Sequence, residues 1–529
     1  MKNIYAYSLI LILISAQPLW SQQEIVIIPQ PNEIHLHEGE SFVITDKTRI
    51  VSNESAQFSA ELLQEAVYRS TGKKLAISTG ARGKFISYVF DKTFDKEAYE
   101  LKVDKRGVQI KASEPAGWFY GTQSLIQLLE NYEEIGSMTI NDAPRFSWRA
   151  FMLDESRHFQ GMEFVKQTLD EMSRLKMNVF HWHLVDDAGW RIEIKKYPKL
   201  TQIGSKRADT EIETWKSGKL AGEPHSGFYT QEEIREIVAY AAKRQINVVP
   251  EIEMPGHSSA AIASYPWLGT EGKLTEVPVL FGRHYDNYDV TKPEVVEFIH
   301  NVLTEVFDLF PSKVIHIGGD EVDYSVWKET KHVQDYMQKN GINSPADLQI
   351  KFTNEISQFI EENDRRMMGW NEILGLNIHG DFEEKKDDLE AETELAKNVV
   401  VHFWKGDIEM ISKAAEKGYA MVNSLHSSTY LDYNYKNIPL GKAYAFDPIP
   451  GKLDEKFHKN IYGLGCQMWG EWTPDSKTVE YQTYPRIAAY AEVGWTNPAM
   501  KDYDSFVLRL KVMQKRWDSK GINYAKVLD

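Results

Sequence analysis

The chain has 529 residues, a formal net charge of −16 and a sequence pI near 5.5. That acidity argues against nucleic acid or an anionic membrane surface as a partner, because both are bound through basic surfaces. A hydrophobic fraction of 42% with 12% aromatic residues is typical of a globular protein, and the length favours two domains. The single cysteine, Cys466, rules out a disulfide framework or a cysteine metal site, and its apolar surroundings predict core packing.

The N-terminus has the pattern of an export signal. MKNIYAYSLILILISAQPLWSQQE carries one lysine, then an apolar run from Ile4 to Ala16, then small and polar residues. The apolar run is too short for a permanent membrane anchor. We therefore predict a signal peptide over residues 1–22, cleaved near Ser21 to Gln23. The mature protein is then expected in a periplasm or outside the cell, with no stable membrane anchor.

Residues 23–143 predict a small α+β domain. Strand-like segments such as FVITDKTRIV and YELKVDKRGVQIKAS alternate with helical patterns at Gln57–Ser70 and Gly117–Glu130.

Residues 144–529 alternate apolar strand-like runs with amphipathic helical patterns. Eight strands are predicted, at Ala150–Asp154, Val179–Leu184, Val248–Ile252, Val314–Ile317, Arg366–Trp370, Val399–Trp404, Ala420–Ser424 and Ile461–Met468. Helical patterns with apolar residues at three-to-four spacing lie between them, at Phe164–Leu175, Glu232–Arg244, Val295–Phe307, Ala346–Glu361 and Ile408–Lys417. This alternation favours an α/β fold of the (β/α)8 TIM barrel type, and a doubly wound open sheet is the alternative.

The residues that follow the predicted strands are mostly polar or aromatic. These segments are DESRH, DDAGWR, EMPGH, GGDE, NE, WKGD, HSSTYLDY and WGEW. Because active residues of such barrels lie at the carboxyl ends of the strands, the segments predict an active site. Carboxylates accompanied by tryptophans are typical of a glycosidase.

The segment KVIHIGGDEV places Asp320 and Glu321 side by side behind Gly318 and Gly319. The glycines would let a flat ligand approach the backbone. Adjacent Cα atoms are about 3.8 Å apart, so the two acids approach a sugar from one side, whereas ordinary retaining glycosidases flank the bond with two acids. We therefore hypothesise that a 2-acetamido group of the substrate supplies the nucleophile. Glu321 would then protonate the leaving oxygen, and Asp320 would orient the acetamide and stabilise its positive charge.

Longer motifs point to a known family. HIGGDE (316–321), FMLDESRHF (151–159), NVFHWHLVDDAGWR (178–191), VVPEIEMPGHS (248–258) and GWNE (369–372) are distributed over the whole predicted barrel in order. In these motifs the chain resembles family 20 glycoside hydrolases, which are β-N-acetylhexosaminidases. The resemblance implies substrate-assisted catalysis without a cofactor or metal, on an oligosaccharide or glycoconjugate with a terminal β-linked N-acetylhexosamine. The N-terminal domain resembles, more weakly, the small domain that precedes the barrel in this family.

The resemblance implies how the sugar hydroxyls are held. Arg157 in ESRHF would grip the hydroxyls far from the scissile bond through its forked guanidinium. Asp432 and Glu471 would bind the hydroxyls at the outer edge of the ring. A closed pocket of this kind implies an exo mode, in which only a terminal sugar enters.

The resemblance also implies a chain of groups behind the proton donor. Asp186, the first acid of VDDAGW, would orient His257 of PGH, which in turn would contact Glu321 and adjust its proton affinity. Ala188 stands where many relatives carry glutamine, which places little in doubt.

Aromatic residues would surround the acetamide. Trp370, Trp404 and Trp469 would box its methyl group and stack on the sugar, and Tyr430 would donate a hydrogen bond to its oxygen.

Three alternatives stay open from the residues themselves. His181 and His183 lie on one face of a strand, as metal ligands often do, although they are inside the strand rather than at its end. A non-catalytic glycan-binding protein could keep the same pocket. Within the enzyme class, a protein nucleophile is the third alternative, with Glu253, Glu372 and Glu471 as candidates.

Overall fold

The computed structural model describes residues 25–80, 83–282, 286–376 and 390–526. The predicted signal peptide lies outside these residues. Within the described ranges, every helix is too short or too polar to cross a lipid bilayer.

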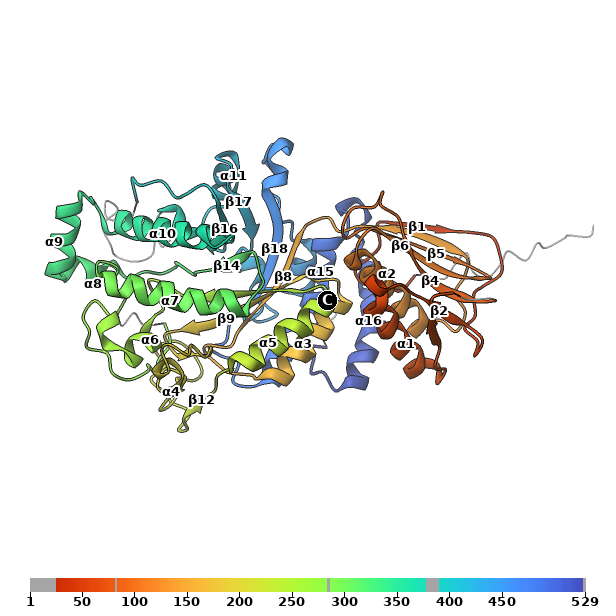
Figure 1. Cartoon of the computed structure of the whole chain (residues 1–529), viewed down its shortest axis with the longest axis horizontal. Helices are drawn as coiled ribbons and strands as arrows, with labels where there is room; N and C mark the ends of the chain where they lie inside the picture. Colours follow the sequence, from red (N-terminus) through yellow and green to blue (C-terminus); the bar gives the residue numbers. More distant parts are fainter. Residues whose placement is uncertain (1–24, 81–82, 283–285, 377–389, 527–529) are drawn as a thin grey trace, which may run out of the picture.

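The N-terminal domain is a seven-stranded mixed sheet with two helices on one face (Figure 1). The strand order is β1 (Glu33–Leu36), β7 (Met138–Asp142), β5 (Tyr99–Asp104), β6 (Gly107–Ala112), β4 (Phe85–Phe90), β2 (Arg49–Val51) and β3 (Ala76–Ser78). Helices α1 (Gln57–Thr71) and α2 (Pro115–Asn131) lie on the side of the sheet that faces the barrel. Gly117 and Gly121 let α2 approach the sheet closely, because a Cβ atom on Gly117 would lie 2.3 Å from the carbonyl oxygen of Ala98.

The second part of the chain is a closed barrel of eight parallel strands. In chain order they are β8 (Trp148–Asp154), β9 (Val179–Asp186), β13 (Asn247–Ile252), β14 (Val314–His316), β15 (Arg366–Trp370), β16 (Val399–Phe403), β17 (Ala420–Asn423) and β18 (Ile461–Met468). Closure comes from the parallel pairing of β18 with β8, from Gly463 opposite Trp148 to Met468 opposite Leu153. The barrel prediction is therefore confirmed, and the doubly wound open sheet is wrong.

Helices surround the barrel as the apolar spacing predicts. They include α3 (Met162–Arg174), α5 (Gln231–Lys243), α7 (Pro293–Leu309), α10 (Pro345–Glu362), α11 (Glu409–Glu416), α15 (Arg486–Trp495) and α16 (Tyr503–Lys520). Helix α5 begins at a capping box, in which the Thr230 hydroxyl accepts from the Glu233 backbone N–H and the Glu233 side chain bonds back to the backbone of Thr230. The buried faces of these helices join one apolar core outside the strands.

The barrel interior is layered because strand side chains alternate between the two faces. Val179, Val249, Met368 and Val400 share one apolar cluster at the lower level. Two residues further along the same strands, the inward positions are polar or aromatic. These are His181, Glu251, Trp370 and His402. The two-residue period thus places a polar layer directly beneath the carboxyl ends of the strands.

A buried ion pair joins the two domains. Lys176 Nζ lies 3.0 Å from Asp142 Oδ2, and both side chains are fully buried. The indole N–H of Trp495, at the end of α15, lies 3.0 Å from both oxygens of the same carboxylate. Trp495 also belongs to the apolar cluster of the N-terminal domain. These contacts fix the barrel against the helical face of the sheet.

Candidate active site

The sequence-predicted site residues come together at the carboxyl ends of the barrel strands. Arg157 follows β8, Asp186 ends β9, His257 follows β13, Asp320 and Glu321 follow β14, Trp370 ends β15, Trp404 follows β16, Tyr430 and Asp432 follow β17, and Trp469 and Glu471 follow β18. Residues more than 300 positions apart are therefore neighbours at one rim. That they bind or transform a ligand stays a prediction of the sequence.

The Gly-Gly step before the acid pair has a structural cause in the packing of the protein. Gly318 and Gly319 have φ values of +67° and +87°, in the left-handed region. A Cβ atom on Gly318 would lie 1.5 Å from Glu253 Oε2, and one on Gly319 would lie 2.7 Å from Ile373 Cγ2. That a flat ligand approaches the backbone of these glycines stays a prediction, but their Cβ positions are not open space. The protein itself fills that space.

Two non-glycine residues of the site, one after β13 and one after β14, have unusual backbone conformations. Glu321 and His257 both have a φ of +48°, which side chains with a Cβ atom seldom adopt. Such strain persists only where surrounding contacts enforce it, and it is concentrated at functional sites. The fold therefore constrains both residues together.

The acid pair faces one imidazole. His257 Nε2 lies 3.7 Å from Glu321 Oε2 and 3.8 Å from Asp320 Oδ2. The Asp320 side chain is 11% exposed, whereas the Glu321 side chain is 35% exposed. Burial raises the pKa of Asp320 to about 8 against the opposing charge of His257, and the carboxylates of Glu372 and Glu321 add to the rise. One acid is thus enclosed and the other is accessible.

Two aspartates hold the opposite side of the imidazole. His257 Nδ1 lies 3.4 Å from Asp186 Oδ1 and 3.3 Å from Asp187 Oδ2. Burial alone would lower the pKa of His257, but Asp186, Asp187 and Glu321 raise it well above its usual value. Asp187 was not among the predicted residues, although the DD pair was visible in the sequence. The distances are compatible with the predicted role of Asp186 and add Asp187 beside it.

Arg157 is held rigidly at the rim. Its guanidinium lies 2.8 Å from Asp186 and 3.1 Å from Asp154, and it is centred 5.1 Å from the ring of Trp469. Burial would lower the pKa of Arg157, but Asp186 and Asp154 raise it well above its usual value, so the group stays charged. A fixed cation of this kind can bind hydroxyl oxygens without losing further side-chain freedom.

The aromatic residues form a continuous wall. Trp370 and Trp469 have ring centroids 5.9 Å apart, Trp469 and Tyr430 are 6.0 Å apart, and Tyr430 stacks on Trp404 at 6.1 Å. The indole N–H of Trp404 donates to the carboxylate of Glu372 at 3.0 Å. These rings give a continuous aromatic surface near Asp320 and Glu372; that they surround an acetamide stays a prediction.

Two further acids, Asp432 and Glu471, interact with each other at the same rim. Burial raises the pKa of Asp432 well above its usual value, and the charge of Glu471 adds to the rise. Burial likewise raises the pKa of Glu471, although Arg157 opposes the rise. Asp432 Oδ1 and Asp320 Oδ1 are buried without a hydrogen-bond partner among the described residues. Buried polar atoms are normally paired, so these oxygens are suited to accept hydrogen bonds from a bound ligand.

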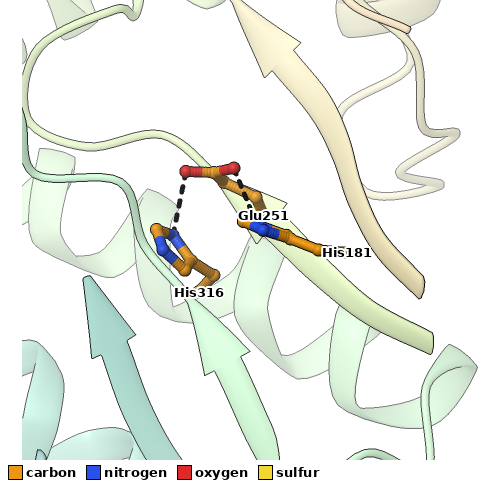
Figure 2. Close-up of side chains that lie close together, drawn as sticks. All are labelled: His181, Glu251 and His316. Carbon is orange, nitrogen blue, oxygen red and sulfur yellow. Dashed lines mark ion pairs between the residues drawn. The ribbon is translucent and has the colours of Figure 1, made fainter. Parts of the chain in front are cut away.

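A polar layer beneath the rim contains the histidines that raised the metal alternative. Figure 2 shows Glu251 between His181 and His316, with carboxylate-to-imidazole distances of 2.8 Å to each. These three side chains could also hold a cation, as could His183 with Asp186 and Glu253. In this structure, however, Glu251 contacts His181 and His316 directly, at hydrogen-bonding distance. Glu251 and His316 were not among the predicted site residues. Their two-residue spacing from the apolar layer was the available signal.

The candidate protein nucleophiles are engaged with protein groups. Glu253 is 2% exposed and lies beneath Gly318, with its carboxylate 3.4 Å from His183 Nε2. Glu372 accepts from Trp404. The positive charge of Arg157 interacts with the carboxylate of Glu471 and opposes the rise in its pKa. This arrangement disfavours Glu253 and Glu372 as attacking groups.

Adjacent carboxylates, a tethered imidazole and an aromatic wall at the mouth of a TIM barrel define a glycoside hydrolase. Comparison with family models agrees. Residues 146–498 match the catalytic domain of glycosyl hydrolase family 20, and residues 24–143 match domain 2 of the same family. The chain therefore belongs to glycosyl hydrolase family 20 and to its β-N-acetylhexosaminidase class.

Proteins named β-hexosaminidase align with most of the chain. It is 36% identical to a β-hexosaminidase of Porphyromonas gingivalis over 94% of this chain and 64% of that protein, so it spans less than two thirds of that relative. It is 34% identical to a β-hexosaminidase of Vibrio furnissii over 88% of this chain and 76% of that protein.

Solved structures show the same fold. A family 20 exo-β-N-acetylglucosaminidase of Vibrio harveyi, in complex with N-acetylglucosamine, superimposes with a TM-score of 0.82 at 31% identity, over 95% of this chain and 79% of that one. A β-N-acetylhexosaminidase of Bacteroides fragilis gives 0.80 at 28% identity, over 95% and 97% of the two chains.

Proposed function

We propose that the protein removes terminal non-reducing β-linked N-acetylglucosamine or N-acetylgalactosamine from glycans, with retention of configuration, through an oxazolinium intermediate. The observation that carries the proposal is the acid pair. Asp320 and Glu321 are adjacent and converge on one imidazole, so they reach a sugar from one side. The candidate acids Glu253 and Glu372 already contact other protein groups. Glu471, the third candidate, interacts with the charge of Arg157, and we infer that the substrate acetamide acts as the nucleophile.

The first step is displacement within the substrate. The acetamide carbonyl oxygen attacks the anomeric carbon as the glycosidic C–O bond breaks, and Glu321 gives its proton to the departing oxygen. Asp320 accepts a hydrogen bond from the acetamide N–H, whose nitrogen gains positive charge as the ring closes. The exposed position of Glu321 suits contact with a leaving group, and the buried position of Asp320 suits a charge shielded from water.

The second step is hydrolysis. Glu321, now ionised, removes a proton from a water molecule that attacks the anomeric carbon, and the oxazolinium ring opens to restore the acetamide. His257, between the aspartates and Glu321, supports both protonation states of that acid. Two inversions at one carbon give net retention.

An exo mode follows from three charged residues that are proposed to surround the outer edge of the sugar. Arg157, Asp432 and Glu471 follow β8, β17 and β18, and the charge of Glu471 interacts with both Arg157 and Asp432. Hydroxyls of a terminal sugar would meet these groups. The name of the Vibrio harveyi neighbour, an exo-acting enzyme with bound N-acetylglucosamine, supports the assignment.

The experiment that tests the function compares aryl glycosides. We expect release of 4-nitrophenol from the β-N-acetylglucosaminide and almost none from the plain β-glucoside, with strong inhibition by N-acetylglucosamine-thiazoline. Similar turnover of both glycosides would contradict the acetamide mechanism. Binding of N-acetylglucosamine without any turnover would instead indicate a glycan-binding protein.

We also propose export, on the pattern of residues 1–22. N-terminal sequencing of the protein recovered from a periplasmic or culture fraction should begin near Ser21 to Gln23. Recovery of the intact N-terminus from the cytoplasm would contradict it.

A further inference from the structure

The carboxylate of Glu251 lies at the centre of the polar layer, below the sugar-binding rim. It is flanked at 2.8 Å by His181 Nε2 on one oxygen and by His316 Nδ1 on the other (Figure 2). Glu251 and His316 are 0% exposed, and His181 is 1% exposed. The three residues come from the neighbouring strands β9, β13 and β14, so the barrel itself fixes their positions.

The same carboxylate accepts a hydrogen bond from the aromatic wall. Trp370 Nε1 donates to Glu251 Oε1 at 2.8 Å. An indole N–H can only donate, and Trp370 is 1% exposed, so this bond fixes which way the ring faces. The imidazole of His402 stacks on the ring at 4.2 Å, and Trp469 lies 5.9 Å away on the side of the wall.

We propose that Glu251 is a positioning residue that locks the ring of Trp370 and so sets the size of the compartment for the substrate acyl group. The inference rests on the proposed function, in which Trp370 is part of the box around the acetamide methyl. Glu251 itself would touch neither the sugar nor the reacting atoms.

The flanking histidines explain why a carboxylate can serve here. Burial would raise the pKa of Glu251, but His316, His181 and His183 lower it well below its usual value. Burial lowers the pKa of His316 itself to about 4, so the charged neighbour is His183, whose pKa Glu251 and Asp154 raise well above its usual value against the effect of burial. The acceptor of the Trp370 bond is therefore charged, and hydrogen bonds to charged acceptors are roughly twice as strong as neutral ones. A neutral or shortened side chain would hold the indole less firmly, and the wall could then yield to a larger acyl group.

The first test uses 4-nitrophenyl glycosides with N-acetyl, N-propionyl and N-butyryl groups. The wild type should lose about tenfold or more in kcat/KM for each added methylene, as expected of a shaped apolar pocket. In Glu251→Gln, which removes the charge, and in Glu251→Asp, which withdraws the carboxylate, N-acetyl activity should fall about tenfold and the preference for N-acetyl should shrink at least about fivefold. Trp370→Phe lacks the indole N–H and should reduce the preference for the N-acetyl substrate by a similar factor. The Glu251→Gln/Trp370→Phe double variant should reduce that preference no further than either single variant does.

Glu171 offers a matched control. It is also buried at 1% exposure, and Oε2 accepts from the indole N–H of Trp517 at 3.1 Å, but it lies on α3 outside the barrel interior. Glu171→Gln should lower thermal stability and leave the acyl preference unchanged. A general loss of packing would alter both variants alike, so the comparison separates positioning from stability.

The second test needs no substrate. The NMR signal of the Trp370 indole N–H is assigned by its loss in Trp370→Phe. This proton should exchange with deuterium at least about tenfold faster in Glu251→Asp than in the wild type. Its exchange rate should be unaltered in Glu171→Gln. Wild-type exchange in Glu251→Asp would overturn the positioning role whatever the substrate proves to be. So would an unchanged acyl preference in soluble Glu251→Gln or Glu251→Asp while Trp370→Phe alters it. Equal cleavage of acetamido and plain glucosides by the wild type contradicts the proposed function, and the exchange result then decides the role of Glu251 separately.

Discussion

The carboxylate of Glu253 occupies the space that a side chain on Gly318 would need. A Cβ atom at Gly318 would lie 1.5 Å from Glu253 Oε2. Gly318 is two residues before Asp320. The absence of a side chain at Gly318 therefore helps to set the backbone path that positions Asp320 and Glu321. The packing of the protein, and not only the ligand, requires glycine at this point.

Gly318→Ala should therefore impair catalysis. The added methyl group must displace Glu253 or the backbone, and φ at this position is +67°. A shift of about 1 Å in the acids predicts a loss of about a hundredfold in kcat/KM. Gly451→Ala serves as the control, because nothing lies within 4 Å of the position that its methyl group would take. Wild-type activity of Gly318→Ala would show that the turn tolerates the side chain.

The pH dependence of kcat/KM should report Asp320. Ionised Asp320 is the form that stabilises positive charge on the acetamide, so activity should rise with pH through its pKa, near 8 in the unliganded site. Glu372 raises that pKa and His257 lowers it. Glu372→Gln should move the rising limb to lower pH by about one unit, and His257→Gln should move it to higher pH. Shifts in the same direction would refute this assignment.

The two acids should differ in their response to the leaving group. Glu321→Gln removes the proton donor, so kcat/KM should fall about 10²–10⁴-fold on chitobiose and much less on a dinitrophenyl glycoside, which leaves without protonation. Asp320→Asn weakens charge stabilisation, so it should affect both substrates alike. A loss at Glu321 that is independent of the leaving group would remove it as proton donor.

The interdomain ion pair should matter for stability. Lys176→Met leaves Asp142 buried without its cation, which predicts a loss of about 3–5 kcal/mol in the free energy of unfolding, measured by urea denaturation. Lys105→Met removes the pair between Lys105 and Glu40, whose side chains are 61% and 76% exposed, and should cost at most about 1 kcal/mol. Equal effects would mean that the domain contact is not held by this pair.

The sequence was sufficient to predict the barrel, because strand runs and helical patterns alternate at regular intervals. Buried Cys466 was also predicted correctly. The polar layer was harder to predict, since Glu251 and His316 sit within apolar strands and their meaning depends on which face points inward. The role of Gly318 depended on Glu253, 65 positions earlier in the chain. Contacts of that kind arise from the three-dimensional packing of β13 against β14 and leave no local pattern.

The account depends on the substrate acetamide acting as the nucleophile, and fluorination of its methyl group tests this most directly. Fluorine withdraws electrons from the carbonyl oxygen and weakens its attack, and each fluorine adds less bulk than a methyl group would. Across the N-acetyl, fluoroacetyl, difluoroacetyl and trifluoroacetyl 4-nitrophenyl glycosides, kcat/KM should fall steeply with each fluorine. A constant kcat/KM across the series, with a sugar ester trapped on a side chain of the protein, would contradict the account.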